Sequence, residues 1–482
     1  MFNFRIIARF FSLALIFEGL FMLLSGAAAF LYKEPTAFSL LFAAIITIVT
    51  GALVFAPFKD EEKISGNKEG YVIIAGIWLI FSLFGTLPYL MSGAITNFGN
   101  AFFESVSGFT TTGATILTDI ESQSHGILLW RSLTQWIGGI GFIIISLSVL
   151  PVAKTINIQL TLTDFTGQPT EKIHPKTNEI VKRLISIYTV LTLTEAIMLY
   201  FGGMNLFDSI CHSLSTISTG GFSTKNDGIA AFGSPFILVT LTVFMFLAGT
   251  NMTLIYFGIK QNFRKISGNN EFTFYIIICL VFTFLSFITL LLSSVYPAGK
   301  ALLEGSFQAV SIISTTGYFN ADYNLWGGTM VTILFILMFT GGTSGSPSGS
   351  LKVIRLLLVT RNARHEMKRM MHPNAYIPVR LDKKTVPPGI VYNLLVFITL
   401  YFLFILLSSL IVSFMGYDII TSFSTSAAML GNIGPGIGSF GPFSSYAELP
   451  SSGKYFFSFL MILGRLELLP VLILFTRNFY KR

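Results

Sequence analysis

Charged residues are scarce in this sequence, at 11% of 482 residues, against about 25% in an average soluble domain. Cysteine is scarce too, since Cys211 and Cys279 are the only two and both lie inside apolar stretches. These counts exclude a soluble globular domain, a disulfide framework and a cysteine metal cluster. The net charge of +8 does not indicate nucleic-acid binding, because the basic residues lie in short loops between apolar segments.

Long apolar runs are abundant: hydrophobic residues make up 52% of the chain, and several runs reach the roughly 20 residues that a helix needs to cross a bilayer. We therefore predict an all-α polytopic membrane protein. Ten spans are expected, at 10–32, 37–57, 71–92, 125–150, 180–203, 234–258, 272–295, from about 326, at 389–415 and at 454–479. The first two form a helical hairpin. A cleaved signal peptide is the alternative for the first span, which exceeds the usual hydrophobic region of about 7–15 residues.

The distribution of basic residues predicts the orientation of these spans. If the N-terminus is cytoplasmic, six inner segments hold 25 of the 31 Lys and Arg residues: 1–9, 58–70, 151–183, 260–271, 352–385 and 477–482. Basic loops favour the cytoplasmic side of a membrane. We expect both termini to be cytoplasmic. Glu18, inside the first span, either pairs within the bundle or faces a polar crevice.

Four Thr/Gly-rich turns each lie between two spans and follow a segment too short to cross the membrane. The short segments are 97–109, 205–217, 301–313 and 418–430. Aligned on Gly113, Gly220, Gly317 and Gly434, the turns lie 107, 97 and 117 residues apart. The fourth turn is degenerate and lacks the Thr-Gly pair. The chain is thus expected to hold four pseudo-repeated units of helix, half-helix, turn and helix around one pore.

Such turns suit a dehydrated cation. A half-helix that returns through an extended turn leaves backbone carbonyls free to replace the hydration shell, and glycine permits the unusual dihedrals that aim them. The predicted filter, acting mainly through carbonyls, consists of Thr111, Thr112, Gly113, Ser218, Thr219, Gly220, Thr315, Thr316, Gly317, Asn432, Ile433 and Gly434. The alternative is that small residues only let the helices pack closely.

Each short segment also carries a carboxylate: Glu104, Asp208, Glu304 and Asp418. For the last three we favour capping of the half-helix N-terminus, with enrichment of cations at the pore mouth as the alternative. Glu104 lies deeper in its segment, and we expect it to brace the first turn by hydrogen bonds.

Two further features interrupt expected spans. The first is a run of glycine, serine and proline that cannot sustain a helix: Gly341, Gly342, Thr343, Ser344, Gly345, Ser346, Pro347, Ser348 and Gly349. We predict an intramembrane loop that partly blocks the permeation path; an ordinary cytoplasmic loop is the alternative. The second is Arg465, a costly charge within the last span. We expect it to face the pore axis as an electrostatic barrier, with a buried structural pair as the alternative.

Together these residues resemble the Trk/Ktr/HKT superfamily of potassium transporters, and more closely its bacterial TrkH type. The four turns, the run at 341–350, Arg465, the leading hairpin and the inner loop 167–176 carry the resemblance. It implies a K⁺-conducting subunit in the bacterial cytoplasmic (inner) membrane, with no organic cofactor. It also implies a homodimer with one pore per protomer and a cytoplasmic TrkA-like ring of nucleotide-binding domains that gates the pore. Glycine in all four turns is similar to the pattern of the potassium-selective members of this superfamily.

On this interpretation the chain divides into an N-terminal hairpin, 1–70, and four pore units: 71–178, 179–271, 272–385 and 386–482. The basic stretch from Lys352 to Lys384, with nine Lys or Arg, is the expected docking surface for the ring. A contact with lipid headgroups or a topology signal is the alternative.

Two rival functions come from other classes. Gly345-Ser346-Pro347-Ser348-Gly349 suggests an intramembrane serine protease, but of the five histidines only His212 lies near membrane depth. The sequence also lacks a nucleotide-binding P-loop, so we expect no enzyme activity. The second rival is a cation-coupled symporter, driven by protons or sodium; such transporters often have inverted repeats, whereas the units here are parallel.

Overall fold

The computed structural model describes residues 3–58, 67–148, 176–382 and 384–480. Most of the inner loop 167–176 and part of the loop 58–70 lie outside these residues. The described chain is helical apart from one two-stranded ribbon, β1 (Arg380–Leu381) with β2 (Lys384–Thr385). The predicted all-α polytopic class is confirmed.

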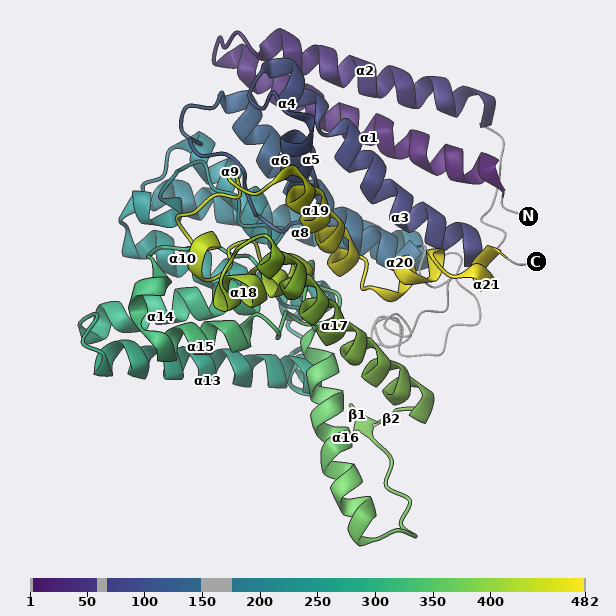
Figure 1. The fold of residues 1–482 in the computed structure, drawn as a ribbon, viewed down its shortest axis with the longest axis vertical. Helices are drawn as coiled ribbons and strands as arrows, with labels where there is room; N and C mark the ends of the chain where they lie inside the picture. Colours follow the sequence, from purple (N-terminus) through teal and green to yellow (C-terminus); the bar gives the residue numbers. More distant parts are fainter. Residues whose placement is uncertain (1–2, 59–66, 149–175, 383, 481–482) are drawn as a thin grey trace.

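The chain opens with the predicted hairpin of two long helices, α1 (Phe4–Leu31) and α2 (Ala37–Phe55), followed by a 3₁₀ turn at Ala56–Phe58. The helices lie side by side along one edge of the molecule (Figure 1). Gly19 and Gly51 permit this approach, because a Cβ at either would lie within 3 Å of the opposing helix. Glu18 is fully buried in α1, and within the described chain its carboxylate accepts no hydrogen bond.

Four helical units follow. The first contains α3 (Asn67–Phe84), α4 (Leu87–Ser92), α5 (Phe98–Phe109) and α6 (His125–Ser148). The second contains α8 (Lys176–Phe201), α9 (Leu206–Ile217), the 3₁₀ turn Gly228–Phe232, α10 (Pro235–Ala248), α11 (Met252–Ile259) and α12 (Phe263–Ser267). The third contains α13 (Asn270–Leu292), α14 (Ala298–Ile313), the 3₁₀ turn Tyr323–Trp326, α15 (Gly328–Leu337) and α16 (Val353–Met371). The fourth contains α17 (Pro388–Phe414), α18 (Ile419–Gly431), the 3₁₀ turn Gly438–Phe440, α19 (Ser451–Arg465), α20 (Leu469–Leu474) and α21 (Arg477–Tyr480).

The four half-helices are α5, α9, α14 and α18. Three begin at a side-chain cap that accepts a backbone N–H three residues on: Asn97, Asn205 and Asp418. The fourth, α14, begins after Pro297 at Ala298, earlier than the expected start at 301. The predicted ends agree within one residue because each half-helix stops at its Thr/Gly turn.

Continuous spans are fewer than predicted. Among the described residues, seven helices are long and apolar enough to cross a membrane, or eight if α10 and α11, bent by 109°, count as one. The expected unbroken spans at 234–258 and 454–479 are wrong, whereas the span from 326 is interrupted at the Gly/Ser run as predicted. The span at 234–258 breaks at Gly249, the span from 326 after Leu337, and the span at 454–479 after Arg465. Glycine and the Gly/Ser run are poor helix formers, and at the third break Glu467 and Leu468 have positive φ, 60° and 54°.

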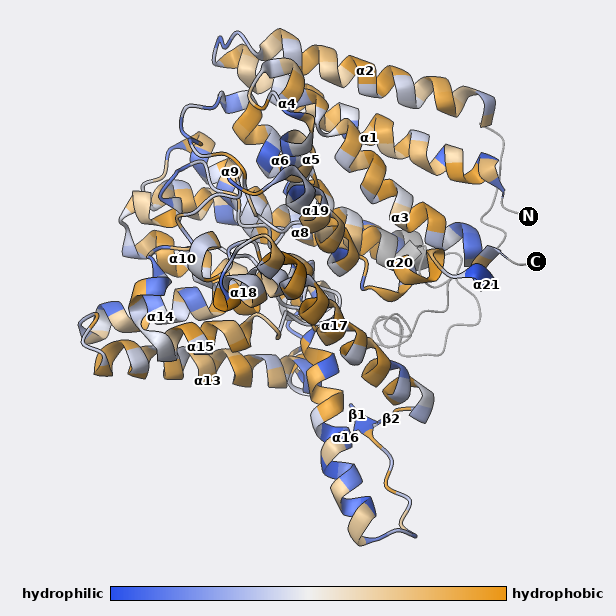
Figure 2. Ribbon diagram, viewed as in Figure 1, coloured by the Kyte–Doolittle hydropathy of each residue, from blue (hydrophilic) through white to orange (hydrophobic). Residues whose placement is uncertain are grey.

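Helix α16 extends away from the bundle with the β1–β2 ribbon beside it (Figure 1). It is the most hydrophilic long helix in the view, whereas α13, α15 and α17 are mostly apolar (Figure 2). Its first turn differs from the rest, because Lys352 and Arg355 are only 5% and 2% exposed. These two residues therefore do not belong to an accessible basic surface, which corrects the expectation for 352–384.

Candidate cation site and intramembrane loop

The four turns close into one ring. A Cβ added to the glycine of each turn would lie 1.8–2.5 Å from a carbonyl oxygen of the next turn. The pairs are Gly113 with Gly220 O, Gly221 with Thr316 O, Gly317 with Ile433 O, and Gly434 with Thr112 O. The last pair returns to the first turn, so the units surround one axis in chain order. Glycine is required at these places because any side chain would strike the neighbouring backbone.

The ring corrects the alignment of the second turn. The glycine equivalent to Gly113, Gly317 and Gly434 is Gly221, since all four have positive φ, between 77° and 99°. Gly220 lacks this conformation and occupies the position of Thr112 instead. The sequence alone left the Gly220-Gly221 doublet ambiguous, and the expected register was one residue out.

Each turn begins with the same hydrogen-bond pattern. A residue in left-handed conformation donates its N–H to the carbonyl three residues earlier, and the next N–H returns to the carbonyl five residues earlier, as in a Schellman motif. The left-handed residues are Thr111, Thr219, Thr315 and Asn432, with φ between 53° and 59°. Threonine is unusual there, at a cost of about 1–2 kcal/mol each. Such strain is typical of functional sites.

In this pattern the backbone N–H groups at the start of each turn donate hydrogen bonds to the half-helix, whereas at least one carbonyl group of each turn accepts none in the described part of the chain. From the described residues, no hydrogen bond reaches the carbonyl oxygens of Thr111, Thr219, Thr315 or Asn432. A cavity of about 320 Å³ adjoins the ring and is lined by Gly113, Gly221, Gly317 and Pro435, one residue from each turn. Unsatisfied carbonyls around one axis, next to a polar cavity, are the chemistry that binds a dehydrated cation.

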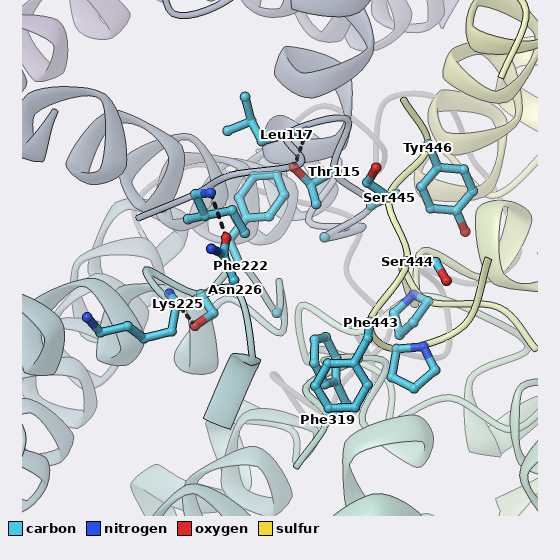
Figure 3. Close-up of a pocket in the computed structure, with 18 of the residues that line it drawn as sticks. Thr115, Leu117, Phe222, Lys225, Asn226, Phe319, Phe443, Ser444, Ser445 and Tyr446 are labelled. Atoms are coloured by element: carbon cyan, nitrogen blue, oxygen red, sulfur yellow. Dashed lines mark hydrogen bonds between the residues drawn. The ribbon is translucent and has the colours of Figure 1, made fainter. Parts of the chain in front are cut away.

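The cavity forms a vestibule beside this ring (Figure 3). On one side the ring of Phe319 packs edge-on against Phe443, 5.0 Å between centroids. On another, Asn226 accepts the N–H of Ile120 at 2.7 Å and donates to Asp119 at 3.2 Å. The bond from Asn226, with help from Ser122, lowers the pKa of Asp119. The vestibule walls are thus tied together across units.

The fourth turn keeps the ring geometry with different side chains. Asn432 takes the left-handed place of threonine, and its Nδ2 donates to Thr112 Oγ1 at 3.0 Å and to the carbonyl of Met461 at 2.9 Å. The carbonyl of Gly434 accepts the hydroxyl of Tyr446 at 3.0 Å. The fourth turn therefore differs chemically from the other three.

The carboxylates brace the segments that follow the turns. Glu104 accepts the N–H of Ile116 at 2.9 Å and pairs with Arg131 at 2.9 Å. Asp208 accepts the hydroxyl of Thr224, and Glu304 accepts the amide of Asn320; each partner lies 16 residues later. Asp418 alone is an N-cap. The expected bracing by Glu104 and capping by Asp418 are confirmed, whereas capping by Asp208 and Glu304 is wrong, because Asn205 and Pro297 hold those positions. Asp208 does lie in the first turn of α9, where its charge compensates the helix dipole.

Arg131 lies beside the candidate site, and it was not singled out from the sequence. It lines the vestibule, yet it is 1% exposed and its guanidinium also donates to the carbonyl of Ser223 and lies 4.2 Å from the ring of Phe222. The carboxylate of Glu104 offsets the charge of Arg131 beside the cavity. Glu104 and Arg131 lie 27 residues apart in the sequence, so no local sequence pattern indicated that they would pair.

The run 341–349 is an irregular segment inside the protein, directly against the turns. The N–H of Gly349 donates to Thr315 Oγ1 at 2.8 Å, and a Cβ on Gly349 would lie 2.2 Å from the carbonyl of Gly431. At its other end, the N–H of Thr343 donates to the carbonyl of Gly249, where the second unit's span breaks. Irregular backbone at this depth persists because protein surrounds it.

Cationic side chains hold the same loop. Arg465 donates to the carbonyls of Pro347 and Gly138, and its guanidinium lies 4.4 Å from the ring of Phe142. It is 1% exposed. Its neighbour Glu467 pairs instead with Arg355, at 2.7 Å. Arg465 thus binds backbone carbonyls of two units rather than a carboxylate.

Comparison with known proteins agrees with this geometry. A family model described as TrkH, a cation transport protein, matches residues 37–480. The chain belongs to the TrkH family. A Trk system potassium uptake protein TrkH from Halomonas elongata is 34% identical over 99% of each chain, and one from Salmonella typhimurium is 32% identical over 99% of this chain and all of the other. The crystal structure of the potassium transporter TrkH from Vibrio parahaemolyticus matches with a TM-score of 0.90, at 30% identity over the whole of both chains.

TrkH-family membership confirms the resemblance and assigns the chain to the transporters rather than to an enzyme class. It is a multi-pass membrane protein. Within the described residues, no three His, Cys, Asp or Glu side chains gather as they would around a metal ion.

Proposed function

We propose that the chain is the potassium-translocating membrane subunit of a Trk-type uptake system. The single observation that supports this most is the closed ring of four turns beneath the vestibule. K⁺ is the permeant ion, and it sheds its water for the carbonyls of the turns around Gly113, Gly221, Gly317 and Gly434.

The loop 341–349 is the gate of this path. Its contacts with Thr315 and Gly431 place it at the ends of the third and fourth half-helices, below the ring. Arg465 fastens it to α6 and sets a positive barrier next to it. Movement of the loop away from these contacts opens the path.

The proposed oligomeric state, membrane orientation and partner are based on the family and on the distribution of basic residues. The chain works as a homodimer in the bacterial inner membrane, with both termini in the cytoplasm. A cytoplasmic TrkA-like nucleotide-binding ring gates it, and the exposed basic residues of α16 are its docking surface. The names of the relatives, each part of a Trk system, support a multi-subunit assembly.

Ion flux in liposomes tests the proposed function. Wild-type protein should carry K⁺ faster than Na⁺, and Gly113→Ser should reduce that preference, because the new Cβ would lie 2.2 Å from the carbonyl of Gly220. An unchanged preference would remove the first turn from the filter. A pH gradient imposed without a K⁺ gradient tests the coupled alternative, since only a proton symporter would then accumulate K⁺.

A further inference from the structure

Lys352 ends the intramembrane loop in an unusual conformation. Its φ is 41°, and Ser350 two residues earlier also has a positive φ of 58°. This backbone turns the lysine side chain back into the loop instead of out along α16. The side chain is buried, although a flexible charged chain in this position would ordinarily reach water or headgroups.

The ammonium of Lys352 lies among loop oxygens. Nζ donates to the carbonyl of Ser346 at 2.9 Å and of Ser348 at 2.5 Å, and Ser348 Oγ lies 3.4 Å away. The ring of Phe142 adds a cation–π contact at 5.6 Å. Arg465 binds the carbonyl of Pro347 between them, so three consecutive loop carbonyls each accept a cationic donor.

These oxygens are of the kind that hold the permeant ion. Carbonyls and a hydroxyl coordinate K⁺ in filters, and an ammonium is a compact point charge that binds the same oxygens. We propose that the carbonyls of Ser346 and Ser348, with Ser348 Oγ, form a cation site inside the loop. The ammonium of Lys352 fills it as a tethered substitute for a permeant monovalent cation. This inference rests on the proposed gate function of the loop.

The consequence is an exchange. While the tethered ammonium occupies the site, the loop stays against Thr315 and Gly431. When a permeant metal cation such as K⁺ takes these oxygens, Lys352 is released, the N–H donors that hold the loop are lost, and the loop moves. The gate thereby responds to the cation that it passes, through a site separate from the ring of four turns.

Removal of the ammonium followed by its replacement from solution tests this. The full chain in liposomes is compared as wild type, K352A and K454A, with propylammonium chloride added on both sides. K454A is the matched control, because Lys454 is also buried and its Nζ also donates to a carbonyl, of Ala447 at 2.8 Å, but far from the loop. Loss of a charged hydrogen bond should raise the K⁺ flux of K352A roughly tenfold or more.

Propylammonium should then return the K352A flux toward the wild-type value and leave wild type and K454A unaffected, while propanol has no effect. If K352A does not fold, K352M, which keeps the chain length, replaces it. A folded K352A or K352M with wild-type flux, or with raised flux insensitive to propylammonium, would show that the lysine only fastens the loop. Absence of K⁺ flux from wild type and variants alike would overturn the proposed function itself.

Discussion

The corrected register of the second turn predicts that Gly221, and not Gly220, contacts the next turn of the ring. The variants Gly221→Ser and Gly220→Ser test this prediction. The two glycines are adjacent and the substitution is the same, yet their surroundings differ. Gly221 has a φ of 80°, and a Cβ there would lie 2.0 Å from the carbonyl oxygen of Thr316. A Cβ on Gly220 would instead meet the end of the Gln135 side chain, at 2.4 Å.

The expected change in the ratio of K⁺ to Na⁺ binding follows from these contacts. A side chain in left-handed conformation costs about 1–2 kcal/mol, and the clash at Gly221 adds to it because a backbone carbonyl of the next turn must move. If the K⁺-occupied ring bears that strain, the ratio of K⁺ to Na⁺ binding falls roughly five- to thirtyfold. At Gly220 the group that must shift is the buried Gln135 amide, with its bonds to the Gly220 carbonyl and the Phe222 N–H, rather than the backbone of the next turn, so we expect a smaller change in selectivity.

The assay is the reversal potential of each variant in a planar bilayer with K⁺ on one side and Na⁺ on the other. Gly221→Ser should shift it toward zero, and Gly220→Ser should leave it closer to wild type. Thermal melting in detergent controls for misfolding. A loss of selectivity in Gly220→Ser alone would refute the assignment of Gly221 to the ring.

Three further predictions concern residues around the ring. Glu104→Ala should lower the free energy of unfolding by about 3–5 kcal/mol, measured by denaturant titration, because Arg131 would keep a buried, unpaired charge; Glu104→Gln, which keeps the size but not the charge, should lose nearly as much, and a Glu104→Gln loss close to zero would exclude the ion pair as the cause. Asp418→Ala should cost about 1 kcal/mol as a lost cap, and Asp418→Asn little; since the bond from Thr421 lowers the pKa of Asp418, the carboxylate's contribution should be full above its unfolded pKa of about 3.9 and disappear as the pH falls through its lower folded value. Arg465→Gln should raise K⁺ flux in liposomes by freeing the carbonyl of Pro347, and an unchanged flux would contradict the barrier role.

Periodic and compositional signals predicted the elements that depend on local sequence. The hairpin, the half-helices and the helix ends at the turns follow from apolar run lengths and from Thr/Gly punctuation. The break at Gly249 did not, because α10 stops there where the loop residues Gly342 and Thr343 pack against Gly249. The length of an apolar run does not indicate whether a loop from another unit will pack against the helix and interrupt it.

The type of candidate site could be predicted from the sequence, but the residue of the second turn that belongs to it could not. Four glycine turns indicated a carbonyl ring, but the choice between Gly220 and Gly221 depends on a contact with Thr316, about a hundred residues away. Lys352 was assigned to a surface because it opens the basic stretch from Lys352 to Lys384. Only the fold of the loop shows its ammonium turned inward.

The most direct test of the central claim is the position of a permeant cation. A crystal of the protein grown with thallium in place of potassium would show that position by anomalous scattering. The account predicts density on the axis of the ring formed by the turns of Gly113, Gly221, Gly317 and Gly434. Thallium density elsewhere in the protein, with none inside the ring, would contradict it.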